Sequence, residues 1–458
     1  MKSLSLTARI RIAASLLVVC GVAGVFPVRL PSRTFFRHVA SGSIVLAASP
    51  ASVRTYKEGS RLYIDNGTIK VGVETNWGGA IVEVIWHGMN FVNAYDTGRE
   101  VQAAVYDGDP YPPCGDCKGA MGWDPVQAGD SHKHGSPVIA QTLGEDSIYT
   151  KAQPYHWFPD NKGGGPDKPV SGDVYIEQWV SLLRDYPSGI KVRYKITHFG
   201  NDQHVNSFQE FPAVYVNWEF GRFVYYGGET PWTNGPVTFQ TMPDLPKSSP
   251  HLYAPELWGA FVNDQGIGLA AFIPGQYPYF GGFDRPPTAS KNSGTHYFSP
   301  RAFFSFGPNS VLEGDIYLFG GDYREARQAI YSLHKSLADR DVFAPYGVVD
   351  QPARDAKCTG PLNVSGWAIH ARQVSEVDVL LDDHLVGHAK YGLKRPDLAR
   401  TWSHAPEGAG FWYTLDTTQF PDGKHILGVN AKDAAGNVAV FSRIPVFIDN
   451  RAQAAKPK

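Results

Sequence analysis

The sequence has few charged residues and no strongly basic region. Charged residues make up 19% of the 458 positions, and the formal net charge is −2, with 42 Lys and Arg against 44 Asp and Glu. No arginine-rich tract is present. Nucleic-acid-binding domains carry a clustered basic surface, so nucleic acid is not an expected partner.

Cysteine is also scarce, with four in the whole chain. In an oxidising compartment Cys114 and Cys117 are expected to form a small-loop disulfide, which leaves Cys358 free. A single Cys-x-x-Cys pair supplies two zinc ligands, so a structural zinc site would need two more. No βαβ pattern surrounds the pair, which argues against a thioredoxin-like redox role.

An apolar run too short for a membrane span lies near the N-terminus. Lys2, Arg9 and Arg11 precede it at residues 12–26, the layout of a signal peptide. The run has about 15 residues, fewer than a membrane-spanning helix needs. We predict a cleaved leader within residues 1–50, a secreted or periplasmic location and no membrane association after cleavage. Retention of the run as an anchor is the alternative.

Aromatic residues, glycine and proline are plentiful. Aromatic residues make up 13% of the chain, which also has 48 glycines and 34 prolines. Short runs of Val, Ile, Tyr and Phe lie between clusters of Gly, Asn, Asp and Pro, and long helical patterns are scarce. The composition predicts an all-β, turn-rich fold, and the length suggests two or three domains.

The order of the patterns divides the chain into regions. Residues 51–344 are predicted to form one large β-sandwich, with one late amphipathic helix over residues 322–341. Residues 345–356 are predicted to be a linker. Residues 357–450 contain about seven short strands, which is typical of an immunoglobulin-like sandwich. This second module is expected to be an accessory scaffold. The apolar stripe of the helix consists of Tyr323, Ala326, Ile330, Leu333 and Leu337.

Residues 207–232, SFQEFPAVYVNWEFGRFVYYGGETPW, combine acids with many aromatic side chains. Aromatic rings stack on the apolar face of a pyranose, and a carboxyl group binds hydroxyls or moves protons. We predict a sugar-handling cleft in which Glu210 is a catalytic acid. Its predicted stacking residues are Tyr215, Trp218 and Trp232. The alternative is an edge strand with a surface glutamate and core rings.

A second acid is expected from residues 173–183, DVYIEQWVSLL. Alternation places Tyr175, Glu177 and Trp179 on one face of a strand and mostly apolar residues on the other. An acid between exposed aromatic rings is unusual without a ligand. We predict that Glu177 and Glu210 face one ring-lined hollow, with Trp179 as a stacking residue. The alternative is the solvent face of a sheet.

Several ordered motifs resemble those of one group of proteins. The motifs NWGGAI, NFVNAYDTGREVQ, WDPVQAGD, QEFPAVY and ETPWT fall within residues 63–300. In these motifs the chain resembles secreted β-sandwich proteins related to the galactose-mutarotase-like fold. The resemblance implies a large two-sheet sandwich with a concave face that handles carbohydrate, and it does not fix a reaction. The Cys114–Cys117 insertion and a His-rich loop depart from the usual pattern.

Further polar residues are candidates for the same site. Asp96 and Asp130 are substitutes for either catalytic carboxylate. Arg99 and Gln102 are predicted to bind substrate hydroxyls or to keep an acid ionised. His204 is a substrate-binding candidate with an acid role of the mutarotase type, although a lone loop histidine is more often a surface group.

The His-rich loop offers one possible metal site. Imidazole and carboxylate groups suit zinc or copper, so Asp130, His132 and His134 are potential ligands. Alternate residues of an extended strand share a face, which would bring the two histidines together. A third firm ligand is lacking, and we favour a solvated loop. No cofactor is therefore predicted.

Together these features predict a secreted carbohydrate-active protein whose partner is a polysaccharide or oligosaccharide. Glycoside hydrolysis is preferred, and it needs a protonated and a charged carboxyl group about 5 to 9.5 Å apart. A lyase would instead use a base near a group that neutralises a uronate, for which His204, Tyr215 and Arg222 are available. A sugar epimerase and a non-catalytic glycan-binding cell-surface protein are the remaining alternatives.

Overall fold

The computed structural model describes residues 52–107, 122–244, 250–337, 344–370 and 372–451. The predicted leader and the Cys114–Cys117 pair lie outside the described residues. Cys358 is buried and forms no disulfide. Among the described helices, none has the length and apolar character needed to cross a membrane.

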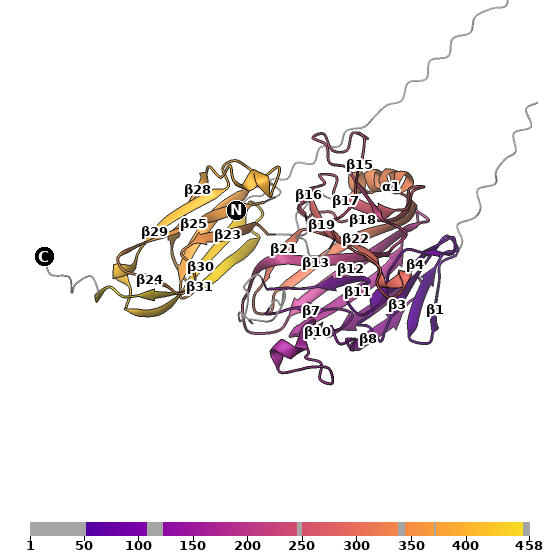
Figure 1. The fold of residues 1–458 in the computed structure, drawn as a ribbon, viewed down its shortest axis with the longest axis horizontal. Helices are drawn as coiled ribbons and strands as arrows, with labels where there is room; N and C mark the ends of the chain where they lie inside the picture. Colours follow the sequence, from indigo (N-terminus) through magenta and orange to yellow (C-terminus); the bar gives the residue numbers. More distant parts are fainter. Residues whose placement is uncertain (1–51, 108–121, 245–249, 338–343, 371, 452–458) are drawn as a thin grey trace, which may run out of the picture. The chain divides into compact units, whose positions relative to one another are not determined.

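Residues 54–322 form two large antiparallel sheets (Figure 1). One sheet has 13 strands. Its main path runs β1 (Arg54–Glu58), β2 (Arg61–Asp65), β3 (Ile69–Glu74), β4 (Ala80–Trp86), β6 (Val101–Ala104), β13 (His204–Asn217), β20 (Thr295–Pro300), β19 (Tyr279–Arg285) and β16 (Leu252–Tyr253). Off this path lie β5 (Met89–Asn90), β7 (Pro125–Val126), β10 (Tyr155–His156) and β21 (Ala302–Phe306).

The other large sheet has nine strands. In spatial order they are β15 (Thr238–Gln240), β14 (Arg222–Tyr225), β17 (Trp258–Val262), β18 (Ile267–Phe272), β22 (Val311–Asp322), β12 (Gly189–His198), β11 (Val174–Leu182), β9 (Ser147–Ala152) and β8 (Val138–Leu143). Four short 3-10 helices occur in the described residues: η1 (Pro159–Lys162), η2 (Lys291–Ser293), η3 (Leu398–Arg400) and η4 (Thr417–Gln419).

Period-two alternation explains how the two sheets share one core. On β11, Val174, Ile176 and Val180 are buried, and the residues between them are partly exposed, as predicted. Gln178 faces the core with them, and its amide donates to the Gly79 carbonyl at 2.8 Å, so this buried polar group is satisfied.

The shared core contains residues of both sheets. Val101 and Val214 come from the 13-stranded sheet, whereas Ile176, Val192 and Ile316 come from the nine-stranded sheet, and all five belong to one buried cluster. The predicted all-β, sandwich-type fold class is confirmed. The outer faces of the two sheets therefore lie on opposite sides of this core.

The late helix α1 (Tyr323–Ser336) packs on the nine-stranded sheet, as predicted. Its N-cap Asp322 accepts a hydrogen bond from the Arg324 backbone N–H at 2.7 Å. Arg327 is buried on the packed face, where its guanidinium binds Glu256 at 3.0 and 3.1 Å. Glu256 is fully buried, so this ion pair anchors the helix to the sheet.

Two smaller sheets follow in the orange to yellow part of the chain (Figure 1). The four-stranded sheet consists of β23 (Tyr346–Gln351), β25 (Pro361–Ile369), β29 (Gly410–Asp416) and β28 (Lys390–Leu393). The five-stranded sheet consists of β24 (Ala356–Cys358), β31 (Val438–Ile448), β30 (Gly423–Asp433), β26 (Val374–Leu381) and β27 (His384–His388).

These two sheets enclose a second core. Val364 and Phe411 of the four-stranded sheet pack in one cluster with Val379 and Val429 of the five-stranded sheet. Within residues 345–356, where a linker was predicted, Tyr346–Gln351 forms strand β23, which pairs with β25, and the domain boundaries stay a prediction. The immunoglobulin-like topology of the module stays a prediction.

Candidate active site

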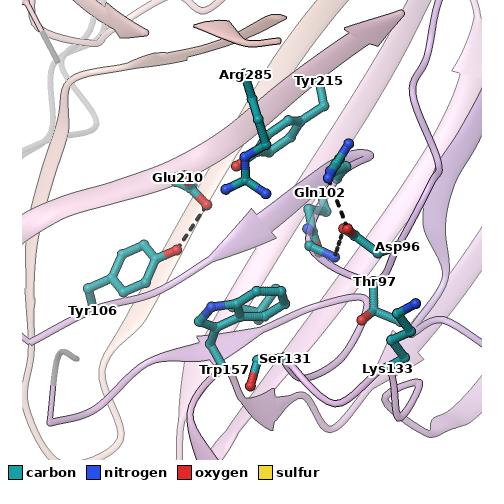
Figure 2. Close-up of a pocket in the computed structure, with 13 residues that line it drawn as sticks. Asp96, Thr97, Gln102, Tyr106, Ser131, Lys133, Trp157, Glu210, Tyr215 and Arg285 are labelled. Carbon is teal, nitrogen blue, oxygen red and sulfur yellow. Dashed lines mark hydrogen bonds and ion pairs between the residues drawn. The ribbon is translucent and has the colours of Figure 1, made fainter. Parts of the chain in front are cut away.

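A pocket of about 330 Å³ opens on the outer face of the 13-stranded sheet (Figure 2). On β6, Val101 and Ala103 point into the core, so Gln102 between them points outward into the pocket. On β13, Tyr215 lies between the core residues Val214 and Val216 in the same way. Five predicted site residues line this pocket, namely Asp96, Arg99, Gln102, Glu210 and Tyr215.

An irregularity in β13 brings Glu210 and Tyr215 to one face. An odd separation along a regular strand would put them on opposite faces. The pairing with β6 shifts, because Glu210 lies opposite Ala104 and Ala213 lies opposite Gln102. Glu210 and Ala213 are three residues apart on β13, but their partners on β6 are two residues apart, so β13 has one extra residue in a bulge. After this bulge, the side chains of β13 point to the opposite face from the one that regular alternation would give.

Glu210 is held by two tyrosines. The Tyr106 hydroxyl donates to its Oε2 at 3.0 Å, and the Tyr297 hydroxyl donates to its Oε1 at 2.6 Å. Burial raises the pKa of Glu210, whereas the two hydrogen bonds and the charge of Arg301 lower it without cancelling the effect of burial. Glu210 therefore holds a proton to higher pH than an ordinary glutamate.

The tyrosines around Glu210 are neutral. Burial, and next the charge of Glu210, raise the pKa values of Tyr106, Tyr215 and Tyr297 well above the ordinary value. Each is therefore a hydrogen-bond donor and a poor base near neutral pH.

The second carboxylate of the pocket is Asp96. Its Oδ2 lies 3.2 Å from Nη2 of Arg99, and its Oδ1 accepts the Gly98 backbone N–H at 3.2 Å. Arg99 is buried and also donates to the Ser293 carbonyl at 2.7 Å. Burial lowers the pKa of Arg99, but a guanidinium stays charged in proteins. The ion pair with Arg99 fixes the position of Asp96 at the pocket.

Arg285, at the end of β19, was missed by sequence reasoning. Its exposed guanidinium points into the pocket in Figure 2, and it makes no ion pair or hydrogen bond with any described residue. Arg285 pairs opposite Thr295, two residues from the pair of Phe283 with Tyr297. No sequence signal marks Arg285, because only the order of strands β13, β20 and β19 brings it beside Tyr215.

Trp157 forms an aromatic wall of the pocket and was also missed. A Cβ atom on Gly98 would lie 2.3 Å from the Trp157 ring, so the loop approaches this ring closely only because residue 98 is glycine. Trp157 is partly exposed, and its ring is available for stacking. The available signal was the aromatic, glycine-rich stretch of residues 155–168.

Asp130 supports the pocket from behind and does not line it. It is fully buried, and its carboxylate accepts from the backbone N–H groups of His132 and His134 at 3.0 and 2.9 Å. It also contacts Nδ1 of His134 at 2.8 Å, whereas Nε2 of His132 contacts Asp160 at 2.6 Å. The proposed grouping of Asp130, His132 and His134 around a metal is therefore not formed, because the two imidazoles meet different carboxylates.

Glu177 lies on the other side of the sandwich. It projects from the outer face of β11, where the Tyr149 hydroxyl donates to it at 2.9 Å and the Lys195 ammonium lies 3.8 Å away. Trp179 packs on Tyr149 there, with ring centroids 5.0 Å apart. The prediction that Glu177 and Glu210 face one hollow is wrong, because the shared core separates the two outer faces.

Four other candidates also lie away from the pocket. Trp218 stacks on His296 with centroids 4.3 Å apart, and Trp232 stacks on His334 of α1 at 3.7 Å. Arg222 lies over a ring of its own sheet. His204 borders a second cavity and stacks on a tryptophan at 3.9 Å. None of these four residues lines the pocket of Glu210.

Comparison with known proteins identifies no family. No family model matches the chain, and no curated protein matches it. Similar solved structures include a polysaccharide lyase, with 9% identity, a TM-score of 0.31, and coverage of 86% of this chain and 47% of that chain. They also include the galactosidase domain of an alpha-galactosidase–sucrose kinase, with 6% identity, a TM-score of 0.37, and coverage of 60% and 43%.

A third similar structure is the 4-alpha-glucanotransferase from Thermococcus litoralis, with 10% identity, a TM-score of 0.34, and coverage of 59% of this chain and 39% of that chain. The chain spans less than half the length of each of these three proteins. At these TM-scores the likeness carries no argument about activity. The resemblance to galactose-mutarotase-like proteins stays a prediction.

Proposed function

We propose that this chain is an exported carbohydrate-active enzyme that hydrolyses glycosidic bonds in the pocket of Glu210 and Asp96. One observation carries the proposal. A carboxyl group whose pKa is raised by burial shares a pocket with a carboxylate held by an arginine. Two acids in contrasting environments are what acid-assisted glycoside hydrolysis requires. The leader-like N-terminus supports export.

In this mechanism Glu210 is the general acid. Its proton passes to the glycosidic oxygen as the bond to the anomeric carbon breaks, and the leaving sugar departs as an alcohol. Asp96, held by Arg99, is the second carboxyl group and either activates water or attacks the anomeric carbon. In both cases the net reaction adds the OH of one water molecule to the anomeric carbon and its H to the leaving sugar oxygen.

Other pocket residues position the sugar. The Gln102 side-chain oxygen accepts the Ala128 backbone N–H at 2.8 Å, which orients its amide NH₂ for a substrate hydroxyl. The partly exposed Trp157 ring offers a stacking surface for a pyranose. Lys133 and Arg285 add positive charge to the rim, so a sugar chain with anionic substituents is accommodated.

β-Elimination on a uronate-containing polysaccharide is the second candidate, and unpaired Arg285 favours it. The guanidinium would neutralise the uronate carboxylate, and Tyr215 is the nearest candidate base among the residues predicted for this role. The raised pKa of Tyr215 keeps its hydroxyl protonated near neutral pH, however, so it is not available to accept the substrate proton, which places hydrolysis first.

Incubation with neutral and uronate-containing polysaccharides tests the proposal. Reducing ends and the ultraviolet absorbance of unsaturated sugars are recorded together. Hydrolysis predicts reducing ends without the absorbance, and Glu210→Gln and Asp96→Asn are each expected to lower kcat by about 10²- to 10⁴-fold. Glu177→Gln is the matched control and should leave kcat unchanged.

The other outcomes separate the alternatives. Unsaturated products would replace hydrolysis by elimination. Sugar binding without any turnover by the unmodified protein would support a glycan-binding protein. Full activity of both Glu210→Gln and Asp96→Asn would remove the pocket from consideration.

A further inference from the structure

A second group of potential ligands lies outside the pocket of Glu210. Asp173, His198, Asp202 and His204 each offer one ligand atom, and these atoms all lie within 4.8 Å of one another. Asp173 directly precedes β11, His198 ends β12, and His204 begins β13. None of the four lines the candidate active site.

The spacing of these atoms matches a four-coordinate ion. Nε2 of His198 lies 3.2 Å from Asp173 and 3.4 Å from Asp202, and Nε2 of His204 lies 3.7 Å from Asp202. Tetrahedral zinc with bonds of about 2.0 to 2.1 Å places its ligand atoms about 3.4 Å apart. Only small side-chain adjustments are therefore needed to enclose an ion.

Both imidazoles are oriented with Nε2 toward the group. Nδ1 of His198 lies 2.8 Å from the Gly307 carbonyl, and Nδ1 of His204 lies 2.9 Å from the Asp107 carboxylate. Each acceptor takes the ring proton on Nδ1, so Nε2 of both rings faces the group. Nε2 of His198 also hydrogen-bonds to Asp173 at 3.2 Å, a contact that an ion between the two would replace. Metal-binding histidines are typically held by a carbonyl or carboxylate in this way.

His204 provides an independent sign of a missing partner. The residue is 5% exposed, and its buried Nε2 has no hydrogen-bond partner among the described residues. This nitrogen points toward the exposed carboxylate of Asp202, with which it forms no hydrogen bond. A buried acceptor of this kind normally meets a donor, a water molecule or a metal ion.

We propose that Asp173, His198, Asp202 and His204 bind one Zn²⁺ ion. Two imidazoles and two carboxylates form a neutral tetrahedral site with a divalent ion, and four protein ligands make the site structural rather than catalytic. The ion would close the turn of residues 199–203 and tie β12 of one large sheet to β13 of the other.

In a second group of potential metal ligands, the place of a metal ion is already taken by a lysine. Glu376, Asp378 and His388 also gather potential ligand atoms. The Lys432 ammonium lies 2.6 Å from Glu376 and 2.8 Å from Asp378, so a side-chain cation already fills that position. Of the two groups found in the described residues, the first has no such lysine or arginine contact and is the one that we assign to zinc.

To test the proposal, metal ions are removed from the full chain with a chelator and Zn²⁺ alone is added back. The zinc content and Tm of the protein are then measured. Elemental analysis is expected to give one zinc per chain, and zinc is expected to raise Tm. Reloading with Co²⁺ should produce the visible absorption of a tetrahedral site. Asp202→Asn is the main variant, because this side chain is 65% exposed and its replacement does not threaten folding.

Asp202→Asn is expected to weaken zinc binding by at least about 100-fold, whereas Asp107→Asn, which acts through His204, should weaken it by about 10- to 100-fold. His132→Ala and Asp378→Asn are controls and should bind zinc normally. Unchanged Tm with no bound zinc would overturn the proposal. So would zinc that survives Asp202→Asn and His204→Ala but is lost in His132→Ala. The glycosidase assay is separate, so failure of either proposal leaves the other measurable.

Discussion

Removing the Tyr297 hydroxyl is expected to raise the pKa of Glu210. The hydroxyl donates to Glu210 at 2.6 Å and stabilises the charged carboxylate, so Tyr297→Phe raises the pKa of Glu210 further. A hydrogen bond to a charged group contributes about 1.5 to 3 kcal/mol, and one pKa unit corresponds to about 1.36 kcal/mol. A general acid must be protonated to act. The loss of activity at high pH should therefore move upward by about 1 to 2 pH units.

The assay is the pH dependence of kcat/KM for the two proteins on one polysaccharide substrate. Tyr149→Phe is a matched control, since it removes the same kind of bond from Glu177, on the other outer face. That variant should reproduce the unmodified profile. A high-pH limb that stays in place or moves downward in Tyr297→Phe would refute the acid role. An upward move of the low-pH limb alone would make Glu210 a base.

Three further predictions test the surroundings of the site. Gly98→Ala forces a methyl group against Trp157, a contact of 2.3 Å, so KM for the sugar should rise in steady-state assays with Tm little changed. Arg327→Ala leaves the buried Glu256 without its cationic partner and should lower the free energy of unfolding by about 3 to 5 kcal/mol in urea titrations, without altering kcat. Burial raises the pKa of Glu100 well above its ordinary value, so stability should fall as pH rises from the unfolded-state pKa of about 4.3 toward the folded one. Glu100→Gln should flatten that decline, and an unchanged pH dependence of the free energy of unfolding would contradict it.

Side-chain periodicity predicted strand β11 and helix α1, but not β23, which lies where a linker was expected. Val71 and Val73 of β3 are buried with the small Gly72 between them, and β2 and β3 form a hairpin around Gly67, whose φ of 81° suits a turn. The stripe of α1 correctly predicted which side of the helix is buried. It did not predict that Arg327 lies on that side, because its partner Glu256 is distant in sequence.

Periodicity could not predict which acids meet. It correctly gave Glu177 and Trp179 a common outward face, but a strand has no local signal for the layer to which it belongs. Likewise, regular alternation would have separated Glu210 from Tyr215, and only the bulge opposite β6 unites them. Asp96 was predicted only as a substitute carboxylate, although it is the acid that shares the pocket with Glu210.

The order of strands, rather than any local motif, therefore assembles the candidate site. Neighbouring strands lie about 4.8 Å apart, so the adjacent strands β6, β13, β20 and β19 bring side chains from three separate stretches of the chain within about 14 Å. Gln102, Glu210, Tyr297 and Arg285 are one outward-facing residue from each of these strands. A sequence motif can supply one or two such residues, and the acid–tyrosine–arginine combination exists only because antiparallel pairing aligns the other strands beside them.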